Sequence, residues 1–302
     1  VSHMAQITLE GVGAEALIEK LTPTDVGAIT EGRVRYSLFL NADGGILDDL
    51  MIARINNSLQ LVVNASRATH DITHIRSYLD TNTVMSVLGN QALLALQGPA
   101  SSTVLENLGL NLNGFTFMQI RQFELLGSLV TITRSGYTGE DGFEISLPAK
   151  DAEDLAKLLL SNEEVEWVGL GARDSLRLEA GLSLYGHELD NDHSPVESSL
   201  NWALSKVRRT GGERQGGYLG DDIIMSHLNE GSESKIVGLQ PEGRMPVRDG
   251  ALIEDDLGNE VGKVTSGGFG PSLEKPIAIA RLETHYIENQ SKLFALVRGK
   301  KI

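Results

Sequence analysis

A glycine-rich loop followed at once by a carboxylate is the first feature of this chain that could do chemistry. Gly136, Gly139 and Gly142 permit positive φ angles and close backbone approach, so the loop that contains them is expected to have a defined shape. From Phe143 to Leu147 apolar and polar residues alternate, which predicts a strand with Glu144 at its start. A carboxylate held there can accept two parallel N–H groups from a planar heterocycle. The alternative is a solvated acidic turn.

Two adjacent carboxylates, Asp48 and Asp49, lie within the otherwise apolar segment 46–51. Neighbouring residues of a strand face opposite sides, so the two are not expected to share an environment. One is predicted to face solvent or cap a turn, and the other to point into the domain. An inward carboxylate is costly unless it is paired or functional, whereas the alternative makes both of them edge charges.

Arg173 stands in the first turn of a helix that is expected to follow Gly171 and to stop at Gly181. The helix dipole disfavours a cation in that turn, so a specific partner such as a ligand carboxylate would account for it. Simple pairing with Asp174 or Glu179 is the alternative.

Two groups of histidines resemble metal ligands in isolation. His70 and His74 are four residues apart on a predicted helix but have no third ligand nearby. His187, Glu188 and His193 match no standard metal-site spacing, so no metal is expected at either place.

The elements that hold these groups follow from alternation and turn residues. Strands are expected at 5–9, 34–40, 46–55 and 59–64, with turns at 41–45 and 56–58, which together make an antiparallel meander. In this meander Asp49 falls opposite Tyr36 or Ser37 on one side and near Asn64 on the other. A register slip of one residue stays open.

Helices and strands alternate through the rest of the chain. Helices are expected at 14–20, after a capping Ser66, from Pro99 to Gly109, at 150–160 and from Gly171 to Gly181; strands are expected at 93–96, 123–126, 129–133 and 143–147. Arg208–Gly217 is glycine-rich and charged, which predicts a mobile connector. Short strands at 236–239, 252–254, 260–264, 277–281 and 293–297 then predict a small β domain, in which Ser266–Pro271 forms a loop.

Composition limits the function. With 302 residues, 41% hydrophobic and 22% charged, the chain has the size and make-up of a soluble protein of two or three domains. A net charge of −15 argues against a nucleic-acid or anionic-membrane surface. Since the chain has no cysteine, thiolate catalysis, disulfides and cysteine-ligated metals are excluded. No apolar run approaches the ~18 residues of a membrane span.

The residues around Glu144 and Arg173 resemble the aminomethyltransferase (T-protein) family of the glycine cleavage system, within the wider family of tetrahydrofolate-dependent aminomethyl- and methyltransferases. The resemblance covers nearly the whole chain, in the family's order and at family-like spacing. Its blocks are Val1–Met4, Gly44–Leu50, Val62–Asn64, Leu96–Pro99, Gly136–Pro148, Gly169–Gly181, Tyr185–Glu188 and Thr265–Gly267. Gly270 before Pro271 departs from the family's usual Ser-Pro.

The resemblance implies an α+β fold, a multi-domain cloverleaf-like arrangement of antiparallel sheets with packed helices and a small C-terminal β-barrel-like domain. The expected domains are a folate-binding meander domain at 5–87, a domain at 88–205 (with 1–4) that carries the glycine loop and Arg173, and a truncated β domain at 206–302.

The resemblance also implies the roles of the site residues. The family's catalytic aspartate corresponds to Asp49. Tetrahydrofolate is the expected co-substrate, with no metal and no flavin, and lipoylated H-protein is the expected partner of a monomeric enzyme. Folate and substrate are expected to contact Met4, Tyr36, Val62, Asn64, Tyr137, Glu144, Arg173 and Tyr185.

Three alternatives stay open. The chain could be another tetrahydrofolate-dependent demethylase of the same superfamily, or a non-catalytic folate-binding paralogue. Val1–Met4 could be a vector remnant, although the family has the same tetrapeptide before a strand. On the native reading the chain is short at both ends, which leaves its activity open. The preferred expectation is the cytoplasm of a bacterial host, and the alternative is the mitochondrial matrix of a eukaryotic one.

Overall fold

The computed structural model describes residues 4–289 and 292–302, so Val1–His3 of the N-terminal block lie outside the described residues. The chain forms two compact units. Of the described residues, the first unit contains 4–39 and 48–169, and the second contains 40–47, 170–289 and 292–302. The three-domain division predicted above stays a prediction. No helix among the described residues is both long and apolar enough to cross a bilayer.

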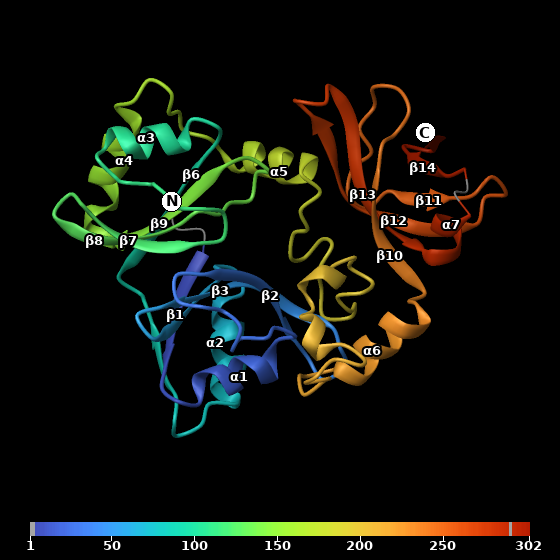
Figure 1. Ribbon diagram of the computed structural model, residues 1–302. Coiled ribbons are helices and arrows are strands. Elements are labelled where there is room, and N and C mark those ends of the chain that lie inside the picture. Colours follow the sequence, from blue (N-terminus) through green and yellow to red (C-terminus); the bar gives the residue numbers. More distant parts are fainter. Residues whose placement is uncertain (1–3, 290–291) are drawn as a thin grey trace. The chain divides into compact units, whose positions relative to one another are not determined.

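A five-stranded antiparallel sheet occupies one part of the first unit, in the order β2-β3-β4-β1-β5. Its strands are β1 (Met4–Glu10), β2 (Val34–Leu40), β3 (Ile46–Ile55), β4 (Ser58–Asn64) and β5 (Val84–Val87). The helices α1 (Ala14–Leu21) and α2 (Ala68–Ser77) lie beside these strands (Figure 1). Alternation along β4 buries Leu59, Leu61 and Val63.

A four-stranded sheet forms the rest of this unit, in the order β6-β9-β8-β7. Its strands are β6 (Gln91–Gln97), β7 (Ile120–Leu125), β8 (Ser128–Thr133) and β9 (Gly142–Pro148), and its helices are α3 (Ser101–Asn107) and α4 (Ala152–Leu160). Phe143, Ile145 and Leu147 on β9 belong to one apolar cluster with Leu155 and Leu159 of α4. Burial of each such side chain stabilises the fold by about 1.5–3 kcal/mol. This face of the sheet therefore belongs to the core.

The second unit contains a six-stranded sheet in the order β10-β13-β12-β11-β14-β15. The strands are β10 (Ser234–Leu239), β11 (Leu252–Glu254), β12 (Glu260–Gly270), β13 (Lys275–Glu283), β14 (Phe294–Val297) and β15 (Lys300–Lys301), and the helices are α5 (Leu170–Glu179), α6 (Asp221–Glu230) and α7 (Thr284–Glu288). Val261, Val264 and Ala280 lie in its apolar core.

The α+β class, the antiparallel sheets and the C-terminal β domain are confirmed. Three local predictions are wrong. Residue Arg67, not Ser66, precedes α2, and no side chain caps this helix. Residues 266–270 continue strand β12 and do not form a loop. The segment 208–217 is folded, since Arg208 is buried and its Nε donates to the carbonyl of Gly216 at 2.9 Å.

Candidate active site

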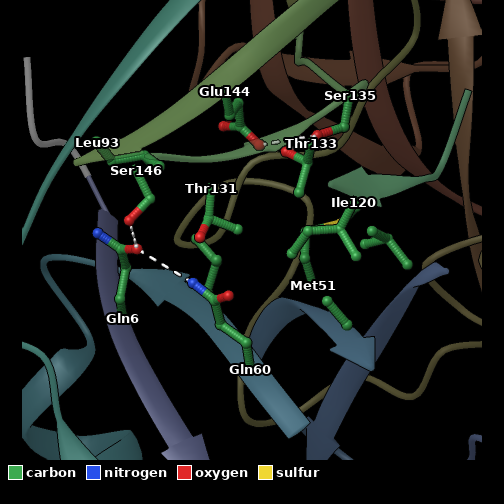
Figure 2. A pocket seen from close by; sticks show the side chains of 13 residues that line it. Gln6, Met51, Gln60, Leu93, Ile120, Thr131, Thr133, Ser135, Glu144 and Ser146 are labelled. Atoms are coloured by element: carbon green, nitrogen blue, oxygen red, sulfur yellow. Dashed lines mark hydrogen bonds between the residues drawn. The ribbon is translucent and has the colours of Figure 1, made fainter. Parts of the chain in front are cut away.

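The two sheets of the first unit enclose a cavity between their facing surfaces (Figure 2). Its empty space, adjoining solvent included, is about 380 Å³. The five-stranded sheet contributes Gln6, Val34, Met51, Ala53, Gln60 and Val62; the four-stranded sheet and its flanking residue contribute Leu93, Ile120, Thr131, Thr133, Ser135, Glu144 and Ser146.

Glu144 reaches this cavity because of the alternation along β9. Phe143 and Ile145 turn to the helix side, so Glu144 turns to the cavity wall. Its Oε2 accepts a hydrogen bond from the Ser135 hydroxyl at 3.0 Å, and Ser135 in turn lies 2.8 Å from the hydroxyl of Thr133 (Figure 2). The carboxylate predicted as a heterocycle acceptor therefore belongs to the wall of a cavity and is not a solvated turn.

The glycine loop before Glu144 is shaped by close packing on Gln97. A Cβ at Gly136 or Gly142 would overlap the Gln97 side chain, whose Nε2 donates to the carbonyls of Ser135 (3.2 Å) and Phe143 (3.3 Å). Gly139 has a φ of +77°. The loop thus uses glycine both for close approach and for a left-handed backbone, as predicted.

An ion pair closes the base of the same loop. Arg134 donates from Nε and Nη2 to the two carboxylate oxygens of Asp141, at 2.9 and 2.6 Å. These hydrogen bonds hold the pKa of Asp141 below its usual value. This ion pair therefore fixes the backbone just before β9, the strand that carries Glu144.

Amide side chains that the sequence analysis did not single out line the opposite wall. The Ser146 hydroxyl donates to Gln6 Oε1 at 2.5 Å, and Gln60 Nε2 donates to the same oxygen at 3.3 Å (Figure 2). Gln6 and Gln60 are both buried. The sequence could have indicated Gln60, because it lies between two buried aliphatic residues, Leu59 and Leu61.

Asp49 lies at the end of the same sheet, in the register predicted from the turns. Asn64 Nδ2 donates to Asp49 Oδ1 at 2.8 Å, and the Tyr36 hydroxyl also donates to the Asp49 carboxylate. Burial, and next the charge of Asp48, raise the pKa of Asp49 to about 6. Burial raises the pKa of Tyr36 well above its ordinary value, and the charge of Asp49 adds to that shift.

The prediction that Asp48 and Asp49 occupy separate environments, one of them solvent or a turn, is wrong. Asp48 is 0% exposed, accepts the backbone N–H of Asn64 on Oδ2 at 3.2 Å, and accepts Asn64 Nδ2 on Oδ1 at 2.9 Å. The two aspartates do leave β3 on opposite sides, but Asn64, the last residue of β4, is placed to bind both. Neither is a simple edge charge.

The predicted residues of the first unit share one surface of the five-stranded sheet. Tyr36, Asp49, Asn64 and Met4 each lie two residues along a strand from a cavity-lining residue, namely Val34, Met51, Val62 and Gln6. Side chains two residues apart point to the same face. Met4 is the direct partner of Asn64 in the register of β1 and β4. The aspartate site therefore continues the cavity face on which Val62 lies.

Tyr137 also belongs to this neighbourhood. It is half-buried in the glycine loop and raises the pKa of Tyr36 through its electrostatic interaction. Tyr36 lies on β2 and Tyr137 in the loop before β9, and the first unit brings the two phenols close together.

Arg173 and Tyr185 belong to the second unit. Arg173 is half-buried on α5, where its two proposed helix partners make other contacts: Asp174 accepts Arg177 Nε at 2.9 Å, and Glu179 Oε1 accepts the backbone N–H of Ser272 at 2.8 Å. The Tyr185 hydroxyl donates to Asn191 Oδ1 at 3.0 Å.

The residues considered as metal ligands have other partners. Glu188 is 0% exposed and accepts Arg177 Nη1 at 2.9 Å, and His193 Nδ1 lies 2.7 Å from Asp190 Oδ1. His74 stacks with His70 on α2, and burial lowers its pKa to about 4. Within residues 4–289 and 292–302, no group of three or more metal-type side chains is arranged around a common point.

Two family models match most of the chain. The family model described as the GCVT N-terminal domain matches residues 1–208, and the one described as the glycine cleavage T-protein C-terminal barrel domain matches residues 235–302. The mitochondrial aminomethyltransferase of Pisum sativum is 40% identical over 100% of this chain and 75% of its own length. That of Saccharomyces cerevisiae is 40% identical over 99% of this chain and 79% of its own length.

A solved structure gives the same result. The crystal structure of glycine cleavage system aminomethyltransferase T from Bartonella henselae aligns with a TM-score of 0.92 and 41% identity, over 100% of this chain and 82% of that one. This chain therefore belongs to the aminomethyltransferase (T-protein) family of the glycine cleavage system.

Proposed function

We propose that the chain transfers the methylene carbon of an aminomethyl-lipoyl arm, carried by H-protein, to tetrahydrofolate with release of ammonia. The observation that carries the proposal is the placement of Glu144 on one wall of a cavity whose opposite wall, the five-stranded sheet, carries the Asp49–Asn64–Tyr36 group on the same face as its lining residues. Tetrahydrofolate supplies the nitrogens that receive the carbon. The side chains of the protein bind the folate and transfer protons.

In this proposal Glu144 accepts the amino and ring N–H groups of the pterin. Val62 and the neighbouring backbone line the ring's site, Met4, Tyr36 and Tyr137 form walls, and Asn64 contributes its amide. Arg173 and Tyr185 of the second unit are proposed to contact the folate as well. The aliphatic side chains of the lining and its single carboxylate suit a flat heterocycle with one polar edge.

Asp49 is the proposed catalytic residue. Its carboxylate accepts the proton of the reacting folate nitrogen or stabilises the cationic carbon during transfer. A pKa of about 6 suits a group that must take up and give back a proton near neutral pH. Its hydrogen bonds to Asn64 and Tyr36 hold the acceptor oxygen in place.

Calorimetry of tetrahydrofolate binding, combined with turnover of loaded H-protein, tests the proposal. Wild type is expected to bind, Glu144→Ala to bind at least about tenfold more weakly, and Asp49→Asn to bind but not to form methylene-tetrahydrofolate. Full affinity in Glu144→Ala would remove the pterin role of Glu144. Binding without turnover on H-protein would favour the demethylase alternative or the non-catalytic paralogue.

The two relatives above are mitochondrial aminomethyltransferases by name, which favours the matrix for a eukaryotic host. The cytoplasm of a bacterial host and the monomeric state stay predictions. A small-zone size-exclusion measurement with light scattering tests the latter.

A further inference from the structure

Two buried carboxyl groups face each other beneath the candidate catalytic residue. Asp71 on α2 and Asp48 on β3 are both 0% exposed, and their side chains hydrogen-bond to one another. A hydrogen bond between two carboxyl groups requires that one of them keep its proton. Two ionised carboxylates in contact away from water would also repel strongly.

The surroundings decide which group is protonated. Asp48 accepts two N–H groups of Asn64, one from the backbone at 3.2 Å and one from the side chain at 2.9 Å. Neither carboxyl oxygen of Asp71 has an N–H or O–H donor among the described residues. N–H donors favour the ionised form of Asp48, so the proton lies on Asp71, which donates it to Asp48.

The charged groups around Asp71 do not reverse this assignment. On its own helix, His70 Nδ1 lies 3.5 Å from Asp71 Oδ1, but burial lowers the pKa of His70 and keeps the ring neutral. The charge of Arg67 favours ionisation of Asp71, and the charges of Asp48 and Asp49 on β3 oppose it. Burial is the largest influence and raises the pKa of Asp71 to about 9.

An ionised Asp48 controls the direction of the Asn64 amide. Carboxylates only accept hydrogen bonds, so the Nδ2 group of Asn64 must point toward Asp48 and Asp49, with one hydrogen for each. The amide oxygen is then turned away from both aspartates. If Asp48 were protonated, it could donate to that oxygen, and the amide could rotate.

We propose that Asp71 is a positioning residue: its protonated carboxyl group keeps Asp48 ionised, and Asp48 in turn orients Asn64 and Asp49 at the transfer site. The part that concerns transfer rests on the proposed function, whereas the protonation of Asp71 does not.

Infrared spectroscopy of the whole chain tests the protonation without any ligand. Wild type at pH 7 is expected to show the C=O stretch of a buried protonated carboxyl group, and Asp71→Asn is expected to lack it. Asp255→Asn is the matched control, because Asp255 is also buried but its pKa is lowered, first by the hydrogen bond from Asn259. A protonated-carboxyl band that persists in Asp71→Asn would overturn the proposal.

The positioning role is tested by comparing Asp71→Asn with Asp71→Leu. Asn keeps a neutral donor for Asp48, so folate affinity is expected to stay within about twofold of wild type, whereas Leu removes the donor and is expected to weaken it about tenfold. In Asp71→Leu, Asp48 takes up a proton itself, and its charge no longer raises the pKa of Asp49. The acidic limb of the pH–rate profile is therefore expected to move to lower pH in Asp71→Leu and to stay in place in Asp71→Asn.

Equal losses in the two variants with an unmoved acidic limb would show that Asp71 serves only packing, and would overturn the role. If Asp71→Leu fails to fold, the limb in Asp71→Asn still decides, since a shift there contradicts the proposal. Failure of the proposed function is distinct, because wild type would then bind no tetrahydrofolate while the infrared band would still report the proton.

Discussion

Ser135 holds the carboxylate that we assign to the pterin. Its buried hydroxyl donates to Glu144 Oε2 at 3.0 Å and is held in turn by Thr133. Ser135→Ala is expected to weaken tetrahydrofolate binding about threefold to tenfold, since a hydrogen bond to a charged group contributes about 1–2 kcal/mol. Ser128→Ala, which removes a bond to Asp151 at the far end of β8, is the calorimetric control. Equal effects of the two variants would contradict a local role for Ser135.

Tyr36 offers a test of Asp49 through pH. The Tyr36 hydrogen bond lowers the pKa of Asp49, which burial has raised to about 6. Tyr36→Phe removes that bond, so the pKa of Asp49 is expected to rise further. If ionised Asp49 is the working form, activity is lost as the pH falls through about 6 in wild type, and this limb is expected to move to higher pH in Tyr36→Phe. Tyr78→Phe is the control and is expected to leave the acidic limb in place. If the limb also stays in place in Tyr36→Phe, it belongs to a group other than Asp49.

At the scale of elements, alternation explains what the sequence could predict. In β9 the apolar residues Phe143 and Ile145 mark the core side, and Glu144 is then obliged to face the cavity. The same period placed Asp49 near Asn64. The role of Asp71 could not be predicted, because its partner Asp48 lies on another element, β3. Its only local signal is its position four residues before the buried Ile75 on α2. Helix α6, which follows the glycine- and charge-rich stretch, was not predicted.

Gly45 shows how an element depends on backbone contact. A Cβ at Gly45 would overlap the carbonyl oxygen of Asn191, and the Gly45 N–H donates to Asn41 Oδ1 at 2.8 Å. Gly45→Ala must therefore displace backbone and is expected to destabilise the chain by more than about 1 kcal/mol. Gly89→Ala is the matched control, since a Cβ there meets nothing within 4 Å. Urea unfolding of both variants measures the difference, and similar midpoints would contradict the argument.

At the scale of the whole molecule, each of the two units has an apolar core, and the second also buries an ion pair. Arg177 is 1% exposed and donates to Glu188 Oε2 at 2.9 Å, to the carbonyl of Leu182 at 3.1 Å and to Ser266 Oγ at 2.7 Å. One guanidinium thus joins α5, the following loop and β12.

Removal of one member of this pair leaves a buried charge without its partner. Arg177→Met is expected to lower the free energy of unfolding by about 3–5 kcal/mol. The double variant Arg177→Met/Glu188→Met is expected to recover much of that loss, because no uncompensated charge remains. Lys157→Met is the control, since its pair with Glu153 is mostly exposed and worth little. Hydrogen exchange is expected to show the loss of protection mainly within 170–302. Equal destabilisation in the single and double variants would mean that packing around Arg177, and not its charge, stabilises the second unit.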